Sequence, residues 1–205
     1  MNDLDFAALL VSRVCHDLVS PVGAVVNGLE VLEEERDPAM RADALKLVTS
    51  SAEQAAARLQ FARIAFGAAG SAGAALDLTE LGRIAGGLLS GGKISLEWAA
   101  AHTTWPKDWA KLLVNAVVIA AESLPRGGTV RVETSPHGSA PGFRIQASGQ
   151  GARVLDEVER ALRGEPVAPL DGRSIQPFLT HRLAQNLNTT LALSCRDGAV
   201  ELTTG

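Results

Sequence analysis

His16 is followed at once by a carboxylate, Asp17, in a segment whose apolar pattern is that of a long amphipathic helix. A neutral imidazole can act as a nucleophile or general base near neutral pH, and a neighbouring carboxylate can hold one of its ring nitrogens protonated. Pro21 comes shortly afterwards, and a proline inside a helix removes one backbone hydrogen bond at a cost of about 3 kcal/mol. We expect a bend just past the histidine, on the face where a partner approaches.

The apolar residues around His16 place it on the outer face of this helix. They recur at alternating spacings of four and three, which is the pattern of a buried seam in a helical bundle. The seam residues are Ala7, Val11, Val14, Leu18, Pro21, Val25, Gly28 and Leu32. Because Val14 and Leu18 hold consecutive seam positions, His16 is predicted to point away from the core and Cys15 to be half-buried.

A second helix of the same kind follows Asp37-Pro38, with Asp37 as the expected N-cap and Pro38 at the first helical position. Its seam residues are Leu45, Val48, Ala52, Ala55, Leu59, Ala62 and Phe66. Two antiparallel helices cannot enclose such seams alone, because one side of each would face water. We therefore expect two copies of the chain to associate as a homodimeric four-helix bundle.

Small residues from Gly67 to Gly73 interrupt the helical pattern and predict a linker, which divides the chain into domains of residues 1–70 and 71–205. Strands are expected at 75–78, 94–98, 129–134, 142–147, 190–195 and 198–204, and helices at 79–90, 106–124, 152–163 and 174–187. Thr79 is the expected N-cap of the first of these helices. The predicted fold class is α+β, a helical hairpin followed by an α/β sandwich with helices on one face of one mixed sheet.

Composition argues against several classes of function. The 205 residues carry a formal net charge of −4 and no basic patch, so binding to DNA or RNA is not expected. No signal peptide is evident, and the apolar stretches read as too short or too interrupted to span a membrane. Cys15 and Cys195 follow no spacing pattern, which indicates free thiols and a cytoplasmic location. Cys15, His16 and Asp17 predict no metal site, because adjacent helical residues point about 100° apart.

The segment His16-Asp17-Leu18-Val19-Ser20-Pro21 resembles the H-box of sensor histidine kinases, in which a histidine, an acidic residue and a proline lie on the first helix of a dimerisation and phosphotransfer hairpin. The resemblance implies that His16 carries a phosphoryl group. Ser20 occupies the position at which kinases with phosphatase activity place threonine or asparagine, which leaves a phosphatase side reaction open.

The order of elements in residues 71–205 is similar to the ATP-binding domain of histidine kinases, the Bergerat-type fold, but its nucleotide-binding boxes are degenerate. Leu112-Leu113-Val114-Asn115-Ala116 resembles the N-box, whose asparagine helps to hold Mg²⁺ in kinases. Ala147 stands where kinases carry the aspartate that binds adenine, and Ser174-Ile175-Gln176-Pro177-Phe178 replaces a glycine-rich turn. We therefore expect no ATP binding and no cofactor or metal held by this chain, with Asn115 in a structural role.

A hairpin that keeps the histidine beside a domain without a nucleotide site resembles the dedicated histidine phosphotransferases of alphaproteobacteria, the ChpT type, over residues 4–204. The resemblance implies a phosphorelay in which His16 takes a phosphoryl group from the receiver domain of a hybrid histidine kinase and passes it to the aspartate of response regulators. Asp17 then binds the second ring nitrogen, and the receiver supplies Mg²⁺. The residues expected to contact the receiver are Ser12, Arg13, Ser20, Gly23 and Asn27.

Two other functions stay open on the sequence. The first is an ATP-dependent sensor histidine kinase core with unusual nucleotide boxes, which autophosphorylation from ATP would reveal. The second is a non-catalytic dimeric scaffold that binds receivers without accepting phosphate, for which replacement of His16 changes nothing in a transfer assay.

Overall fold

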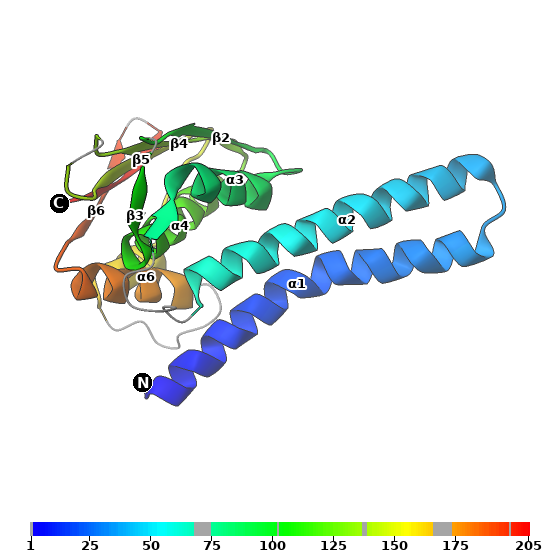
Figure 1. The fold of residues 1–205 in the computed structure, drawn as a ribbon, viewed down its shortest axis with the longest axis horizontal. Coiled ribbons are helices and arrows are strands. Elements are labelled where there is room, and N and C mark those ends of the chain that lie inside the picture. Colours follow the sequence, from blue (N-terminus) through cyan, green and yellow to red (C-terminus); the bar gives the residue numbers. More distant parts are fainter. Residues whose placement is uncertain (1, 68–74, 102, 137–138, 166–173, 197) are drawn as a thin grey trace.

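Two long antiparallel helices, α1 (Asp3–Glu34) and α2 (Pro38–Ala65), extend from an α/β domain in the computed structural model (Figure 1). The structure describes all residues except 1, 68–74, 102, 137–138, 166–173 and 197. Most of the predicted linker at 67–73 therefore lies outside the described residues. The hairpin followed by a mixed α/β domain confirms the predicted fold class within one chain.

The ends of the hairpin helices follow from their capping residues. The side chain of Asn2 accepts a hydrogen bond from the amide of Asp5 and begins α1. The side chain of Asp37 accepts from the amides of Ala39 and Met40, which confirms Asp37 as the N-cap of α2. Helix α1 continues through Pro21, and Figure 1 shows it changing direction partway along its length.

The two helices pack through small residues. A Cβ added to Gly28 would lie 2.7 Å from Cγ2 of Val48, so the helices approach closely here. On α2 the buried positions include Ala44 and Ser51, whereas Leu45 and Leu59 are exposed. Leu45 and Leu59, which the seam pattern places inside a four-helix bundle, are not covered within the single chain, because close helix approach selects small side chains for the contact between α1 and α2.

The α/β domain is built on a mixed five-stranded sheet with the order β2-β4-β5-β7-β6. Its strands are β2 (Ile94–Ala99), β4 (Gly128–Thr134), β5 (Phe143–Ser148), β6 (Leu191–Arg196) and β7 (Ala199–Thr204). Strand β2 is parallel to β4, and the other pairs are antiparallel. Alternate side chains are buried, which places Val130, Ile145 and Leu202 on one inner face.

A separate two-stranded sheet joins β1 (Ala75–Asp77) to β3 (Thr104–Pro106). The first strand was predicted in the main sheet, and β3 was not predicted. Asp77 also accepts hydrogen bonds from the amides of Thr79 and Glu80, so Asp77, and not Thr79 as predicted, caps the next helix. The strand ends where that helix begins, and it pairs with β3 instead.

The remaining helices are α3 (Leu78–Leu89), α4 (Lys107–Glu122), α5 (Asp156–Leu162) and α6 (Ile175–Asn186). Figure 1 shows α3, α4 and α6 on one face of the sheet, as predicted. Helix α5 is shorter than the predicted 152–163, because the amide of Arg153 donates to the carbonyl of Ser123 and ties this segment to the end of α4. Helix α4 is buried from 110 to 121 and forms the centre of the core.

The hairpin joins this core at two places. Phe61, Ile64 and Ala65, near the end of α2, belong to the same buried cluster as α4 and the sheet. At the start of α1, the ring of Phe6 meets that of Phe178 on α6, with centroids 6.1 Å apart, and Arg182 lies over the Phe6 ring. The hairpin is therefore held at the α/β domain, while the far ends of its helices extend away from it.

Two glycines of α3 allow a matched test of this packing. A Cβ added to Gly82 would lie 2.7 Å from the ring of Trp98, whereas at Gly86 the nearest atom is Cδ2 of Leu96 at 4.0 Å. We expect Gly82→Ala to lower the free energy of unfolding by about 1–2 kcal/mol because the rigid indole must move. We expect Gly86→Ala to raise it by up to about 1 kcal/mol through helix propensity. Urea denaturation of both variants measures the difference, and equal effects would contradict the packing at Trp98.

Candidate functional site

His16 lies on the outer side of α1 with 86% of its side chain exposed. The sequence prediction of an exposed imidazole is therefore matched by the structure. Cys15 is exposed as well, so its predicted half-burial is wrong for the single chain. Among the described residues, no group of three or more His, Cys, Asp or Glu side chains is placed to hold a metal ion.

Asp17 lies between His16 and Arg13, a half-buried arginine. Its Oδ1 is 3.4 Å from Nδ1 of His16, at the long end of a hydrogen bond, and its Oδ2 accepts from Nε of Arg13 at 3.0 Å. The side chain of Asp17 is 30% exposed. One carboxylate oxygen is thus taken by the arginine, and the other faces the histidine ring.

Arg13 is held between two carboxylates of this chain. Besides Asp17, its Nη2 donates to Oε1 of Glu122 at 2.7 Å, and only 13% of its side chain is exposed. Burial lowers the pKa of the Arg13 guanidinium, but Glu122 and Asp17 outweigh burial and raise this pKa above its usual value. Arg13 was predicted to contact a partner, and the structure gives it two partners within the chain.

The backbone of Asp17 has a partner that the helical pattern of the sequence does not predict. In an α-helix the carbonyl of residue 17 accepts from the amide of residue 21, but Pro21 has no N–H to donate. The guanidinium of Arg58 on α2 donates to the carbonyl oxygen of Asp17 instead. This charge-assisted hydrogen bond offsets part of the cost of the proline. Its only sign in the sequence is Pro21, which leaves the carbonyl of Asp17 without a helical donor.

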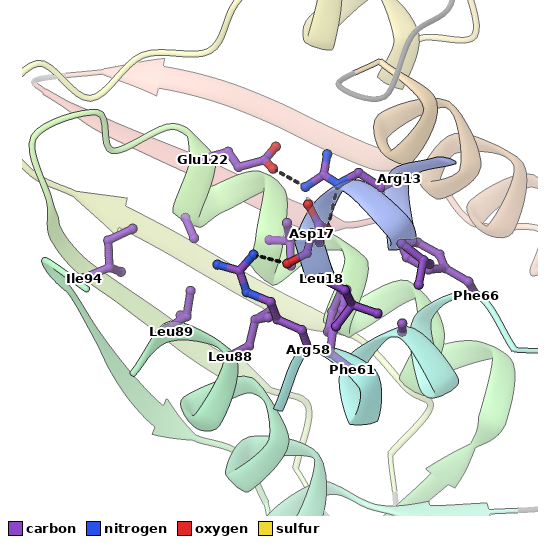
Figure 2. A pocket seen from close by; sticks show the side chains of 14 residues that line it. Arg13, Asp17, Leu18, Arg58, Phe61, Phe66, Leu88, Leu89, Ile94 and Glu122 are labelled. Atoms are coloured by element: carbon purple, nitrogen blue, oxygen red, sulfur yellow. Dashed lines mark hydrogen bonds and ion pairs between the residues drawn. The ribbon is translucent and has the colours of Figure 1, made fainter. Parts of the chain in front are cut away.

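These charged residues stand at a cavity of about 270 Å³ between the hairpin and the α/β domain. Figure 2 shows Arg13 and Asp17 from α1, Arg58 from α2 and Glu122 from α4 converging on one side of it. The rest of the lining is apolar, from Val14, Leu18, Phe61, Ala62, Phe66, Leu88, Leu89, Ile94, Val118 and Ala121. The ionic contacts therefore form where two parts of the fold meet.

The other residues predicted to contact a partner lie along α1 near His16. Ser12, Ser20 and Asn27 are exposed, and Gly23 is half-buried. A Cβ added to Gly23 would meet no heavy atom within 4 Å, so the surface there is low and open. With Ser20 and Gly23 four and seven residues after His16, these small side chains share one helical face with the imidazole.

Asn115, the residue that resembles the N-box asparagine, is fully buried in a polar network at the centre of the core. Its Nδ2 donates to the carbonyl oxygens of Lys111 at 2.9 Å and Ala65 at 3.3 Å. Its Oδ1 accepts from Nε2 of Gln176 at 3.2 Å. The side chain thus connects α4 to the end of α2 and the start of α6, in agreement with the predicted structural role.

Replacement of Asn115 tests this network. Asn115→Ala leaves the buried amide of Gln176 without its acceptor and the carbonyl of Ala65 without its donor, and we expect a loss of about 2–3 kcal/mol in the free energy of unfolding. Asn186→Ala, an exposed asparagine at the end of α6, is the control and should change stability by less than about 0.5 kcal/mol. A near-neutral Asn115→Ala in urea denaturation would contradict the network.

Comparison with known proteins identifies the family. Residues 78–199 match the family model of the histidine phosphotransferase C-terminal domain. A solved structure of a bacterial phosphotransferase is similar over 100% of this chain and 98% of its own, with a TM-score of 0.89 and 36% identity. The chain is also 41% identical over 194 residues to protein phosphotransferase ChpT of Brucella abortus (strain 2308), covering 94% of this chain and 91% of that protein. The family model covers more than half of the chain, and the identity to the Brucella protein extends over most of it, so the chain belongs to the histidine phosphotransferase family.

Proposed function

We propose that His16 is the phosphoacceptor of a multistep phosphorelay, loaded by the receiver domain of a hybrid histidine kinase and discharged to the aspartate of response regulators. The observation that carries the proposal is the exposure of His16, at 86% of its side chain, in a chain of the histidine phosphotransferase family. A receiver can reach the imidazole without any rearrangement of α1.

The transfer step needs little from this chain beyond a positioned imidazole. The lone pair of Nε2 attacks phosphorus, the bond from phosphorus to the receiver's aspartate oxygen breaks, and that carboxylate leaves. Nδ1 keeps its proton and donates to Oδ1 of Asp17, which stabilises the positive charge of the phosphorylated ring. Transfer to a response regulator is the same step in reverse, and the receiver in each case supplies Mg²⁺.

The face around His16 suits the docking of a receiver. Ser12, Ser20, Gly23 and Asn27 give it small or polar side chains, so a partner helix can lie close to α1 without displacing bulky groups. Arg13 contributes differently from our expectation, because its guanidinium is already shared by Asp17 and Glu122. We infer that it neutralises charge near the site without itself binding the phosphate.

We further propose that this chain binds no ATP. Asn115 corresponds to the asparagine that helps to hold Mg²⁺ in kinases. Here its side chain is hydrogen-bonded to Ala65, Lys111 and Gln176. Ala147 is fully buried in β5 between Val130 and Val200, and it offers no acceptor to an adenine amino group. The phosphoryl group must then arrive on a protein partner, which fits a cytoplasmic relay.

A second copy of the chain is the proposed cover for the apolar side of the hairpin. Cys15, Val19, Val22, Val26 and Leu29 form an exposed stripe on α1 at alternating spacings of four and three. Leu45 and Leu59 are exposed on α2, where they extend the apolar surface. Each large apolar side chain buried contributes about 1.5–3 kcal/mol, so self-association would be strongly favoured.

A membrane is the competing cover for α1. Contrary to the sequence expectation, α1 is long and apolar enough, by length and composition, to cross a bilayer. Only 6% of its most apolar 18-residue stretch is buried within the chain. The exposed stripe on α1 has the spacing of a helical bundle, and the other face of α1 carries His16, Ser20 and Asn27. This two-sided pattern favours a four-helix bundle over a span surrounded by lipid.

Replacement of the histidine tests the relay. His16→Ala should abolish labelling by a purified hybrid-kinase receiver domain that has been loaded with acetyl [³²P]phosphate, because no other group is proposed to accept the phosphate. The wild type should be labelled by this receiver and not by [γ-³²P]ATP. Equal labelling of variant and wild type would exclude the relay through His16, and labelling of the wild type by ATP would favour a kinase core.

A charge on the apolar stripe tests the dimer. Val26→Asp should convert the dimer to monomer at micromolar concentration, because a carboxylate cannot be buried there without a partner. Ser50→Glu is the control, since Ser50 is exposed among Asp43, Lys46 and Glu53 on the opposite, polar side of α2. Sedimentation equilibrium measures the mass, and vesicle flotation measures membrane binding. A monomeric wild type, or one that partitions into phospholipid vesicles, would contradict the proposal.

A further inference from the structure

Glu122 occupies a position that helix energetics disfavour. It is the last residue of α4, where the partial negative charge of the helix terminus repels a carboxylate, and no basic residue stands in the last turn of this helix. The compensation comes from the hairpin, because Nη2 of Arg13, distant in sequence, donates to its Oε1 at 2.7 Å. Glu122 is therefore placed for a contact with α1 and not for the stability of its own helix.

A continuous line of contacts runs from Glu122 to the histidine. Arg13 uses Nη2 for Glu122 and Nε for Oδ2 of Asp17, and Asp17 turns Oδ1 toward Nδ1 of His16 (Figure 2 shows the first three residues). The planar guanidinium holds its donors in a fixed fork, so the position of Glu122 sets the plane in which Arg13 meets Asp17. The orientation of the Asp17 carboxylate thus depends on a residue of the α/β domain.

Charge adds to this geometric effect. Arg13 is half-buried between two carboxylates, and their combined attraction outweighs its desolvation, which keeps its pKa above the usual value. With Glu122 present, the positive charge of Arg13 is shared, and Asp17 retains more of its negative charge for the histidine. Without Glu122, Asp17 alone would compensate Arg13, and its Oδ1 would be a weaker acceptor for the proton on Nδ1.

We propose that Glu122 is a positioning residue for phosphoryl transfer at His16, acting through Arg13 and Asp17. This inference rests on the proposed function and deepens it, because it gives the α/β domain a part in the chemistry of the site. Glu122 holds Arg13, Arg13 orients Asp17, and Asp17 keeps the proton on Nδ1 so that the lone pair of Nε2 faces the incoming phosphorus. Neither Glu122 nor Arg13 touches the reacting atoms.

The kinetic test is Glu122→Gln, which keeps the shape of the side chain and removes its charge. Single-turnover transfer from a receiver domain loaded with acetyl [³²P]phosphate should have a maximal rate about fivefold lower, less than the 10²–10⁴-fold that a positioned acid or base group itself contributes. The receiver concentration that gives half of the maximal rate should not change. Glu157→Gln, which removes the same charge from an exposed position of α5, should transfer at the wild-type rate.

The second readout is the tautomer of His16, observed by ¹H–¹⁵N NMR of the ring nitrogens in the protein without any receiver. The wild type and Glu157→Gln should favour the form protonated at Nδ1, and Glu122→Gln should shift the population toward the form protonated at Nε2. An unchanged tautomer and rate in Glu122→Gln would overturn the proposal, as would a change confined to the half-saturating receiver concentration, which would make Glu122 a docking contact. A wild type that accepts no phosphate would refute the proposed function, and the tautomer comparison would still decide the role of Glu122.

Discussion

The packing of the end of α2 into the core of the α/β domain is the contact on which the rest of the molecule depends. Phe61 and Ile64 are buried there, and the carbonyl oxygen of Ala65 accepts a hydrogen bond from the buried side-chain amide of Asn115. These contacts fix the hairpin against α4, and only with that arrangement can Arg13 on α1 reach Glu122. A buried polar network of this kind specifies one arrangement of its helices, because any other leaves donors or acceptors without partners.

The geometry of the candidate site could be predicted from the sequence where it is local. His16 and Asp17 are neighbours in the chain, and the seam on either side of them was sufficient to predict an outward imidazole. Glu122 could not be predicted, because its relation to Arg13 depends on where the end of α4 lies against α1. Arg13 itself was recognised as a residue of the site but given a different partner, since a helical sequence shows charges on one face without showing what they meet across the fold.

In the fold, too, local patterns could be predicted from the sequence, and contacts between distant elements could not. Periodicity predicted both long helices and the strands of the main sheet, because these patterns repeat over many residues. It failed where one residue has two competing roles, as at Asp77, which ends a strand and caps a helix. Within the single chain, the heptad pattern also did not show which side chains meet between α1 and α2, because the close approach of the helices at Gly28 turns Ala44 inward and leaves Leu45 exposed. Packing between elements decides such positions.

Pro21 and Arg58 together fix how the two helices of the hairpin are aligned along their axes. A slide of one helix past the other by one turn, about 5.4 Å, exchanges one set of small apolar contacts for a similar set, so such packing selects an alignment only weakly. The carbonyl of Asp17 lacks its helical donor because of Pro21, and it marks one level on α1 at which the guanidinium of Arg58 finds an acceptor. The proline therefore helps to fix the register of α1 against α2. It does so at Asp17, the residue next to His16.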